Sequence, residues 1–409
     1  MTVGLEDIKA AAEAIAGEVV RTPLVPAPRL SQILGCELSL KLENLQFTGS
    51  FKDRGALNKL KSLGAEEAER GVIAMSAGNH AQGVAYHAQR LGIPATIVMP
   101  EFAPFTKVER TRSFGARVVL AGETIDAAAE AAREIQKAEG LTFIHPYDDP
   151  LIVAGQGSIG LEMLADQPDL EVIVVPIGGG GVISGVALAA KALKPEIRIL
   201  GVEAELFPSM YQAVHDQAPT AGGNTLADGI AVKTPGGLPK SIIEELIEEI
   251  LLVDEATIEA AVQLLVEEQK LVAEGAGAAG VAAIMKHPER FAGQNVAAVI
   301  CGGNIDVRLL SWVLTRGLAR DGRLVRLRVD IVDRPGVLAR ICDCIGQTGG
   351  NIIEVYHQRM FYDVPPKQAE VDVMVETRNP SHVEEIIEKL TAAGFTSRVL
   401  SARSMDPGA

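Results

Sequence analysis

The sequence has few cysteines, few aromatic residues and no excess of basic residues, and each shortage excludes a class of protein. Its 409 residues include four cysteines, whose spacing fits neither a disulfide framework nor a zinc site. Aromatic residues make up only 4% of the chain, which favours helices packed closely on parallel strands over a β-sandwich. The net charge of −15 provides no basic stripe to neutralise phosphates, so we expect no nucleic-acid partner.

The chain also lacks a long, uninterrupted apolar run. Without about 20 consecutive apolar residues, we expect no membrane span and no membrane partner. Segment 1–17 carries acidic residues early and does not show the basic-then-apolar pattern of a secretion signal. Together with the scattered cysteines, these features predict a reducing, cytoplasmic location.

The sequence does contain a regular alternation of short apolar runs and helical segments. Predicted strands over 71–75, 95–99, 117–120 and 142–144 alternate with helices, and a second series begins with a strand at 172–176. Such alternation is typical of the α/β class with doubly wound parallel sheets. Because there are two series, we expect two α/β lobes.

The pattern changes after a polar segment at 320–323. Beyond it, the predicted order is strand, helix, strand, strand, helix, strand, which is the ferredoxin-like βαββαβ arrangement. We therefore place a separate small domain at 324–402. A predicted hairpin loop at 363–367 is longer than this domain requires.

The segment 50–56, Ser-Phe-Lys-Asp-Arg-Gly-Ala, contains the first chemical signal. Lys52 could be a solvated lysine at a helix start, next to Asp53 in an ordinary charge pair. Alternatively, burial and the positive end of the helix dipole lower its pKa, and such a lysine can form a Schiff base with an aldehyde. This segment alone leaves both interpretations open.

Four consecutive glycines at 178–181 form the second signal, because they follow a predicted strand and precede a helix. Glycines let the backbone approach a phosphate closely, and the N–H groups of the helix N-terminus point toward it. A generic tight turn is one alternative. A dinucleotide-binding turn is another, since Glu203 follows the next strand, although the glycine spacing matches that motif only loosely.

Two further polar loops follow predicted strands. Segment 76–83, Ser-Ala-Gly-Asn-His-Ala-Gln-Gly, offers small residues and N–H groups at a helix start, which suit a carboxylate. A helix cap would explain one of its polar residues but not all of them. Segment 300–306 contains Cys301, which alone would be interpreted as a buried apolar residue. Because open α/β folds bind ligands at the carboxyl ends of strands, we expect all four segments to converge on one site.

These four segments occur in an order and spacing that resembles the fold-type II pyridoxal-phosphate (PLP) enzymes of the serine/threonine dehydratase family, which includes serine racemase. The resemblance covers nearly the whole chain. It implies a catalytic domain at 1–321, with a small lobe of roughly 48–147 inserted in a large lobe of 1–47 and 148–321. Segment 324–402 resembles an ACT domain, and a single such domain is typical of the threonine ammonia-lyases (threonine dehydratases) of intermediate length.

The resemblance also implies a role for individual residues. Lys52 would hold PLP covalently and act as the catalytic base. The other residues implied to bind the cofactor are Phe51, Asn79, Gly178, Gly179, Gly180, Gly181, Val182 and Cys301. Those implied to bind the substrate are Ser76, Gly78, Asn79, His80 and, in a turn at 155–157, Gln156.

The implied reaction is β-elimination of water followed by loss of ammonia, with L-threonine giving 2-oxobutanoate and L-serine giving pyruvate. Cys301, assumed to be a neutral thiol, would leave the cofactor ring nitrogen without an acid partner, which favours prompt elimination. Racemases of this family have a second serine where this chain has Ala77, so racemisation is disfavoured. Ser209 stands where a divalent-metal site would have an aspartate, beyond Glu203 and Glu205, and we expect no metal.

The ACT resemblance implies feedback regulation by a branched-chain amino acid, as in isoleucine biosynthesis. The residues implied to bind the effector are Asp333, Pro335, Gly336, Val337, Leu338, Asn351 and Ile352. A purely structural oligomerisation role is the alternative, and we expect a homotetramer or homodimer. Rival functions are another β-hydroxy amino acid dehydratase, an NAD-linked oxidoreductase, and a sensor without catalysis that uses only the C-terminal domain.

Overall fold

The computed structural model describes residues 3–358 and 368–400 of the chain. Its contacts divide the chain into two compact units, 1–305 and 306–409. The predicted loop at 363–367 and the end of the predicted small domain beyond 400 lie outside the described residues. The contacts group helix α14 (Val307–Arg320) with the second unit, whereas the sequence prediction placed these residues in the catalytic domain.

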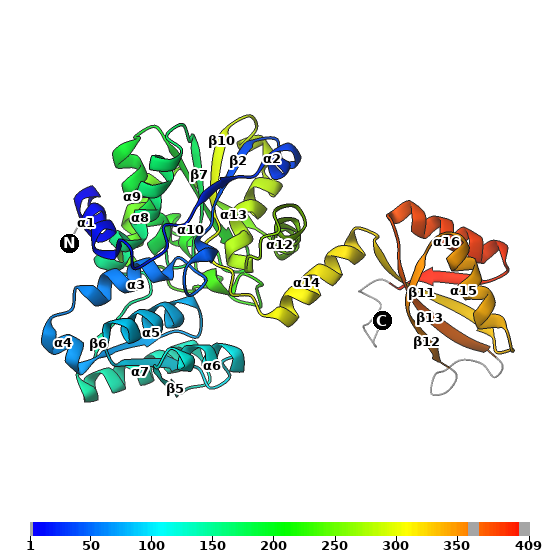
Figure 1. The fold of residues 1–409 in the computed structure, drawn as a ribbon, viewed down its shortest axis with the longest axis horizontal. Helices are drawn as coiled ribbons and strands as arrows, with labels where there is room; N and C mark the ends of the chain where they lie inside the picture. The colour runs from blue at the N-terminus through cyan, green and yellow to red at the C-terminus, as the bar shows by residue number, and fades with distance from the viewer. Residues whose placement is uncertain (1–2, 359–367, 401–409) are drawn as a thin grey trace. The chain divides into compact units, whose positions relative to one another are not determined.

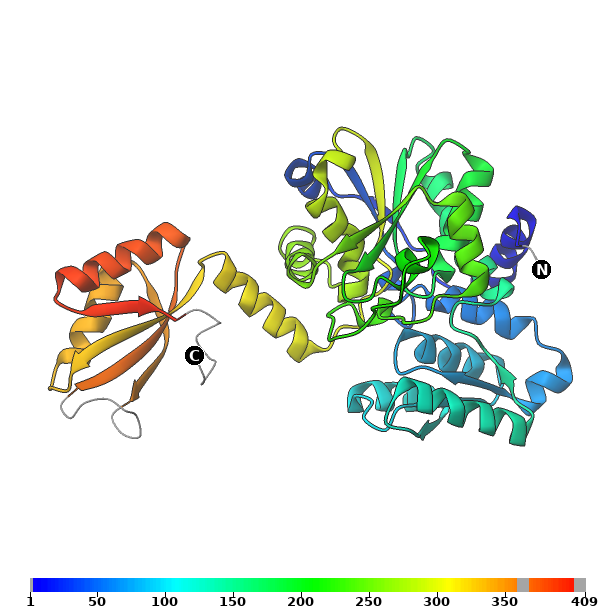
Figure 2. The same ribbon diagram turned by 180° about the vertical axis from the view of Figure 1, so that it is seen from behind.

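The first unit contains two α/β sheets (Figures 1 and 2), as the sequence predicts. The larger sheet has the order β1-β2-β10-β7-β8-β9, and all its neighbours are parallel except β1 and β2. The smaller sheet has the order β5-β4-β3-β6 and is parallel throughout. The strands are β1 (Leu24–Pro26), β2 (Glu37–Lys41), β3 (Val72–Met75), β4 (Ala95–Met99), β5 (Arg117–Leu120), β6 (Thr142–Phe143), β7 (Val172–Pro176), β8 (Arg198–Ala204), β9 (Glu249–Val253) and β10 (Asn295–Val299).

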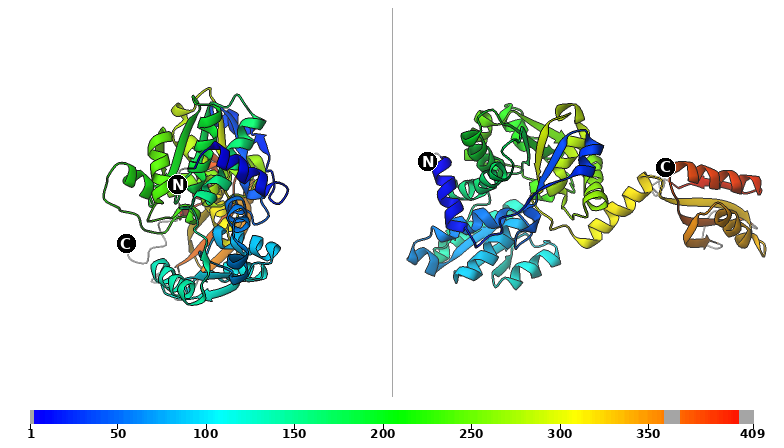
Figure 3. Two further views of the ribbon diagram at one scale, coloured as in Figure 1. Left: turned by 90° about the vertical axis from the view of Figure 1, so that its left-hand side faces the viewer. Right: turned by 45° about the horizontal axis from the view of Figure 1, so that its top comes forward.

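Helices cover both faces of the larger sheet. Helices α9 and α13 both contact β7 and lie on different sides of it (Figures 1 and 3), and every residue of β7 is buried. The helices of this unit are α1 (Leu5–Ile15), α2 (Pro28–Leu34), α3 (Lys52–Lys61), α4 (Ala65–Arg70), α5 (Asn79–Leu91), α6 (Phe105–Ser113), α7 (Ile125–Glu139), α8 (Pro150–Asp166), α9 (Gly181–Leu193), α10 (Ser209–Val214), α11 (Gly237–Leu246), α12 (Glu255–Gln269) and α13 (Gly275–Lys286). Short 3-10 turns are η1 (Glu43–Leu45), η2 (Asp228–Ile230) and η3 (Pro288–Arg290). Over 3–358 and 368–400, no helix combines the length and the apolar character needed to cross a bilayer.

Segment 155–157, which we predicted to be a turn, instead lies inside helix α8, so that prediction is wrong. The Asp149 side chain caps this helix by accepting hydrogen bonds from two backbone N–H groups, and Pro150 occupies its first turn. Glycine is needed here for close packing, since a Cβ on Gly155 would lie 2.7 Å from the Cα of Gly55 in α3. Tertiary packing therefore overrides the local preference of glycine for turns.

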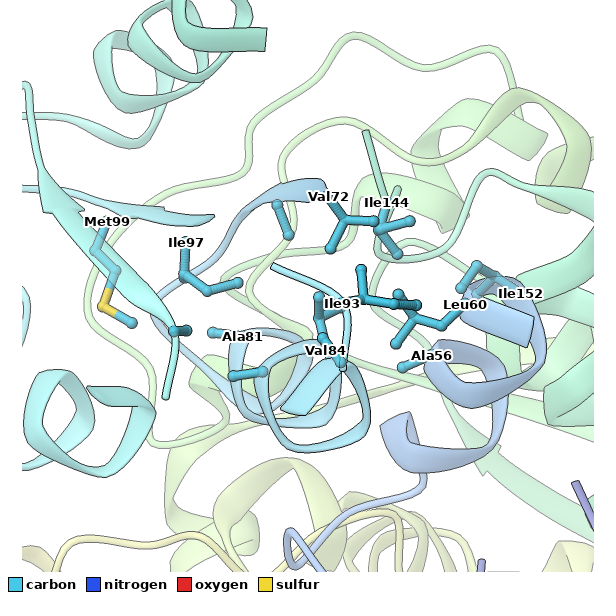
Figure 4. Close-up of a cluster of buried hydrophobic side chains, with 14 of the residues drawn as sticks. Ala56, Leu60, Val72, Ala81, Val84, Ile93, Ile97, Met99, Ile144 and Ile152 are labelled. Carbon is cyan, nitrogen blue, oxygen red and sulfur yellow. The ribbon is translucent and has the colours of Figure 1, made fainter. Parts of the chain in front are cut away.

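The core of the smaller lobe holds α3 in place (Figure 4). Ala56 and Leu60 of α3 pack in one buried cluster with Val72 of β3, Val84 of α5 and Ile97 of β4. Each fully buried large aliphatic side chain contributes about 1.5–3 kcal/mol relative to an exposed one. This packing fixes the N-terminal end of α3, where Lys52 lies.

The second unit has the predicted βαββαβ order, with an antiparallel sheet in the order β12-β13-β11-β14. Burial alternates along β11, as expected when one face of a sheet is covered. The two helices of the βαββαβ arrangement lie together on one side of this sheet (Figure 2) and share its buried cluster. Besides α14, the elements are β11 (Leu324–Val332), α15 (Val337–Gln347), β12 (Asn351–Gln358), β13 (Gln368–Glu376), α16 (Pro380–Ala392) and β14 (Thr396–Val399).

Candidate active site

Lys52 is the first residue of α3, and its position is fixed by the loop that follows β10. The backbone N–H of Phe51 donates to the carbonyl oxygen of Cys301 at 3.0 Å, and Ser50 forms an isolated antiparallel bridge with Gly302. These bonds place Lys52 beside Cys301. The expected placement of the four segments at the carboxyl ends of strands holds for three of them, whereas segment 50–56 follows η1.

The Lys52 amine has no counter-charge. Its Nζ donates to the carbonyl oxygen of Pro146 at 2.7 Å, and within the described ranges no carboxylate lies within ion-pair distance of it. Burial lowers the pKa of Lys52 to about 8. Asp53 does not pair with Lys52, because its buried carboxylate accepts from the backbone N–H and hydroxyl of Thr48. The interpretation of a solvated charge pair is therefore wrong.

Arg54, two residues further along α3, has an opposite environment. Its fully buried guanidinium forms ion pairs with Glu43 at 2.8 Å and with Glu162 at 2.7 Å, and Glu162 also pairs with buried Lys41. The two carboxylates raise the pKa of Arg54 further above its usual range despite burial. Sequence reasoning missed this cluster, because nothing in the local pattern indicates that Glu43 and Glu162 meet.

The four glycines form the turn between β7 and α9. Gly180 precedes the helix with φ +93°, a conformation that favours glycine. A Cβ on Gly179 would lie 2.2 Å from the ring of Tyr147, so a larger residue does not fit there. The first N–H groups of α9, including that of Val182, have no acceptor within the helix and suit a phosphate.

The dinucleotide alternative is not supported by the acidic residue on which it depends. Glu203, in β8, accepts hydrogen bonds from the backbone N–H groups of Met210 at 2.9 Å and Tyr211 at 2.8 Å. Its carboxylate therefore holds the start of α10, and burial raises its pKa to about 7. A carboxylate bound in this way does not present its oxygens to a ribose.

Segment 76–83 links β3 to α5, and the side chains of Ser76, Asn79 and His80 are already engaged, whereas the buried Oε1 of Gln82 has no partner among the described residues. The Ser76 hydroxyl accepts from the N–H of Gly78 at 3.1 Å. The Asn79 amide donates to Glu274 at 2.7 Å and accepts from Asn304 at 2.8 Å. The ring of His80 contacts the carbonyl oxygen of Ile144 at 2.9 Å, and burial lowers its pKa to about 3. The first backbone N–H groups of α5 have no acceptor within the helix, so they are available to bind a carboxylate.

Two buried acids face the site from the larger lobe. Burial and the neighbouring Glu274 raise the pKa of Cys301 well above its usual value, which keeps the thiol neutral. Glu274 is 4% exposed, and burial together with Asp228 raises its pKa to about 7. Sequence reasoning missed Glu274. A lone charged residue in an Ala- and Gly-rich stretch that is otherwise apolar could have indicated it.

Gln156 points from α8 into the interior. The side chain is 1% exposed, and its Oε1 has no hydrogen-bond partner among the described residues. The Ser50 hydroxyl is likewise buried without a partner there. The Gln156 amide lies against Gly55 of α3 and Ser50 lies two residues before Lys52, so a molecule bound near the start of α3 could satisfy these atoms.

The arrangement fits PLP. An uncompensated amine suits the cofactor aldehyde, the glycine turn at a helix N-terminus suits its phosphate, and a neutral thiol suits an unprotonated ring nitrogen. A metal ion has less support. Glu205 pairs with Lys286 and Ser209 donates to the carbonyl oxygen of Val232, and the described residues contain no cluster of three or more His, Cys, Asp or Glu arranged for a metal.

The residues implied to bind an effector do not come together within one chain. Asp333, Pro335, Gly336, Val337 and Leu338 lie where β11 ends and α15 begins. Asn351 and Ile352 begin β12. Glu376 of β13 pairs with Asn351 on one side and with Leu324 on the other. The start of β12 therefore lies level with the start of β11, at the opposite end from the 333–338 segment. The two groups are therefore separated by about 26 Å along the sheet.

Comparisons with known proteins agree with this architecture. Residues 15–302 match the family of pyridoxal-phosphate-dependent enzymes, and residues 321–394 match the ACT domain. An L-threonine ammonia-lyase of Thermotoga maritima is 47% identical over 97% of this chain and 100% of its own length. Another, from Geobacter sulfurreducens, is 44% identical over 96% of this chain and 98% of its own.

Solved structures of threonine deaminase and serine racemase are similar to about three quarters of this chain. The processed form of threonine deaminase isoform 2 from Solanum lycopersicum is 36% identical with a TM-score of 0.72, over 77% of this chain and 90% of that one. Maize serine racemase is 33% identical with a TM-score of 0.72, over 78% of this chain and 99% of that one. The chain belongs to the pyridoxal-phosphate-dependent enzyme family and carries a C-terminal ACT domain.

Proposed function

We propose that this protein is a PLP-dependent L-threonine ammonia-lyase that converts L-threonine to 2-oxobutanoate and ammonia, and L-serine to pyruvate. The observation that carries the proposal is the partly buried amine of Lys52, which has no carboxylate partner among the described residues and lies beside a neutral Cys301. The nearly full-length likeness to two L-threonine ammonia-lyases supports the substrate and the reaction.

The residues around Lys52 have defined roles in this proposal. Lys52 holds the cofactor, and Phe51 and Cys301 lie beside the ring. The turn formed by Gly178, Gly179, Gly180, Gly181 and Val182 binds the phosphate, and Asn79 binds the phenolic oxygen. When bound, the cofactor supplies an electron sink for the electrons of the Cα–H bond.

Lys52 then serves as the base. Once the substrate amine had replaced it, its Nζ would take the α-proton, and the lowered pKa increases the neutral fraction of the amine that is able to do so. The β-hydroxyl leaves with a proton as water, which gives an enamine. Hydrolysis of the enamine consumes one water and releases ammonia and the 2-oxo acid.

The substrate carboxylate binds at the start of α5. Ser76, Gly78, Asn79 and His80 surround it there, with backbone N–H groups and the positive end of the helix dipole as the main attraction. Gln156, whose buried oxygen has no partner in the described structure, completes the polar side of the pocket. Ala77 provides no second acid or base, which disfavours racemisation.

Regulation and assembly follow from the second unit. A branched-chain amino acid that touches both the 333–338 segment and the start of β12 needs two copies of the chain, because the two are far apart in one copy. The proposal therefore includes a cytoplasmic homotetramer or homodimer in which isoleucine or valine binds between ACT domains. Asn351→Ala should abolish any response to isoleucine without lowering the basal rate.

The proposal is tested by adding L-threonine to the purified, PLP-loaded protein and measuring 2-oxobutanoate. Lys52→Ala should lose at least about 10³-fold in kcat and bind PLP without the covalent link. Lys61→Ala is the matched control, because it removes a lysine of the same helix whose surface ion pair with Glu18 contributes little. Turnover by Lys52→Ala at the rate of the control would contradict the proposal.

A further inference from the structure

Four side chains form a chain of hydrogen bonds that passes back and forth between the two lobes of the first unit. Arg110 of α6 donates to Asn304 Oδ1 at 2.9 Å, Asn304 donates to Asn79 Oδ1 at 2.8 Å, and Asn79 donates to Glu274 Oε1 at 2.7 Å. Arg110 and Asn79 belong to helices of the smaller lobe, while Asn304 and Glu274 flank the larger sheet. Each of the three bonds therefore joins one lobe to the other.

This chain of hydrogen bonds through Arg110, Asn304, Asn79 and Glu274, called the relay below, has a fixed direction. The guanidinium of Arg110 can only donate, and an ionised Glu274 can only accept. Reversing either amide between them would bring two oxygens or two N–H groups face to face. The two ends consequently determine the orientation of the Asn304 and Asn79 amides.

The relay leaves one donor free. Asn304 uses both hydrogens of its Nδ2, one toward Asn79 and one toward the carbonyl oxygen of Thr48 at 2.7 Å. Asn79 uses one hydrogen of its Nδ2 toward Glu274. Its second hydrogen has no acceptor among the described residues.

We propose that Glu274 and Arg110 are positioning residues that orient the Asn79 amide so that its free N–H donates to the phenolic oxygen of the cofactor. The proposal rests on the proposed function and deepens it. Because every bond of the relay crosses between the lobes, the donor is correctly aimed only when the lobes are together.

The charges around Glu274 support its role as the accepting end. Asp228 opposes its ionisation and Lys107 favours it, and Lys107 and Asp228 pair with each other at 2.5 Å. Cys301 and the backbone of Asn304 face the same carboxylate. A Cβ on Gly302 would lie 2.3 Å from Glu274 Oε1, so the carboxylate is closely confined.

The test is Glu274→Gln in the full-length protein. A glutamine amide can present an N–H to Asn79, which removes the acceptor that fixes the amide. We expect about tenfold weaker PLP binding to the apoprotein, the loss typical of one charged hydrogen bond. We also expect a shifted midpoint of the pH titration of the bound cofactor's visible absorbance, and a lower kcat with little change in KM.

Arg110→Ala provides the second variant, and Arg112→Ala its matched control. Arg110 is exposed, so its removal should leave the fold intact, and it should change the same spectrum in the same direction by a smaller amount. Arg112 lies on the same helix and pairs only with Glu109 in the described structure, so its removal should change neither spectrum nor affinity. If Glu274→Gln does not fold, Arg110→Ala alone decides.

If folded Glu274→Gln or Arg110→Ala keeps the wild-type spectrum and PLP affinity, the proposal that these residues orient Asn79 is wrong. An equal change in Arg112→Ala would overturn it as well, because the effect would then come from lost surface charge. Failure of the proposed function would look different, since the wild-type protein itself would then neither bind PLP covalently nor act on L-threonine.

Discussion

Lys52 and Arg54 lie two residues apart in the first turn of α3, Lys52 partly and Arg54 fully buried, and they have opposite chemistry. Arg54 is enclosed by Glu43 and Glu162, and its pKa lies above its usual range. Lys52 Nζ donates to a carbonyl oxygen, lies 5.1 Å from the centroid of the Phe51 ring and has no carboxylate partner among the described residues, and burial lowers its pKa to about 8. One turn of helix therefore presents a permanent charge toward the larger lobe and a reactive amine toward the site.

The difference comes from the partners and not from burial. Burial disfavours the charged form of both side chains, and carboxylates reverse this effect for Arg54 alone. Arginine also suits the structural position, because its planar fork can bind two carboxylates at once. A lysine without a counter-charge is suited to covalent chemistry, because its amine is readily neutral.

Replacing each cation with methionine tests whether the carboxylate partners cause the difference between Lys52 and Arg54. Arg54→Met leaves the buried carboxylate of Glu43 without its ion-pair partner, whereas Glu162 retains Lys41, and it should lower the free energy of unfolding by about 3–5 kcal/mol. Lys52→Met removes a buried cation that has no counter-charge, so the apoprotein should be as stable as the wild type or more so. Urea unfolding of the two apoproteins measures both, and equal destabilisation would contradict the comparison.

A double variant tests whether Glu43 and Arg54 stabilise each other. Adding Glu43→Gln to Arg54→Met removes the carboxylate that lost its ion-pair partner, and Glu162 keeps its ion pair with Lys41. We expect the double variant to recover about 1–3 kcal/mol relative to Arg54→Met alone. If instead the two losses simply add, Glu43 and Arg54 do not stabilise each other.

Supplying Lys52 with a counter-charge should make it resemble Arg54. Cys301→Asp places a carboxylate beside Lys52 and should raise the pKa of the amine toward its ordinary value. At neutral pH, the rate of covalent PLP capture by the apoprotein should then fall about tenfold, as expected for a rise of one pKa unit. Cys301→Ser, which stays neutral, is the control and should capture PLP at nearly the wild-type rate.

The sequence predicts the parts of the site whose signals are local. The glycine turn at 178–181, the loop at 76–83 and the βαββαβ order of the second unit each depend on neighbouring residues, and the structure contains them where predicted. The convergence of these segments follows from a general property of parallel sheets. The residues, order and spacing of the four segments then indicated the family.

Features that depend on distant contacts could not be predicted. Glu274 lies 195 positions from Asn79 in the sequence, and Glu162 lies 108 positions from Arg54. The resemblance implied a turn at 155–157, yet these residues lie inside α8, where packing against α3 makes glycine necessary. In each case the deciding partner belongs to another element of the fold.

The central claim, that burial makes Lys52 a readily neutral and reactive amine, is tested by the pH dependence of PLP capture. The rate of covalent attachment to the apoprotein is followed by absorbance from pH 6 to pH 11. The account predicts a rate that rises about tenfold per pH unit and levels off near pH 8, because the neutral amine is the nucleophile. A rate that continues to rise to pH 10.5, the ordinary pKa of lysine, would contradict it.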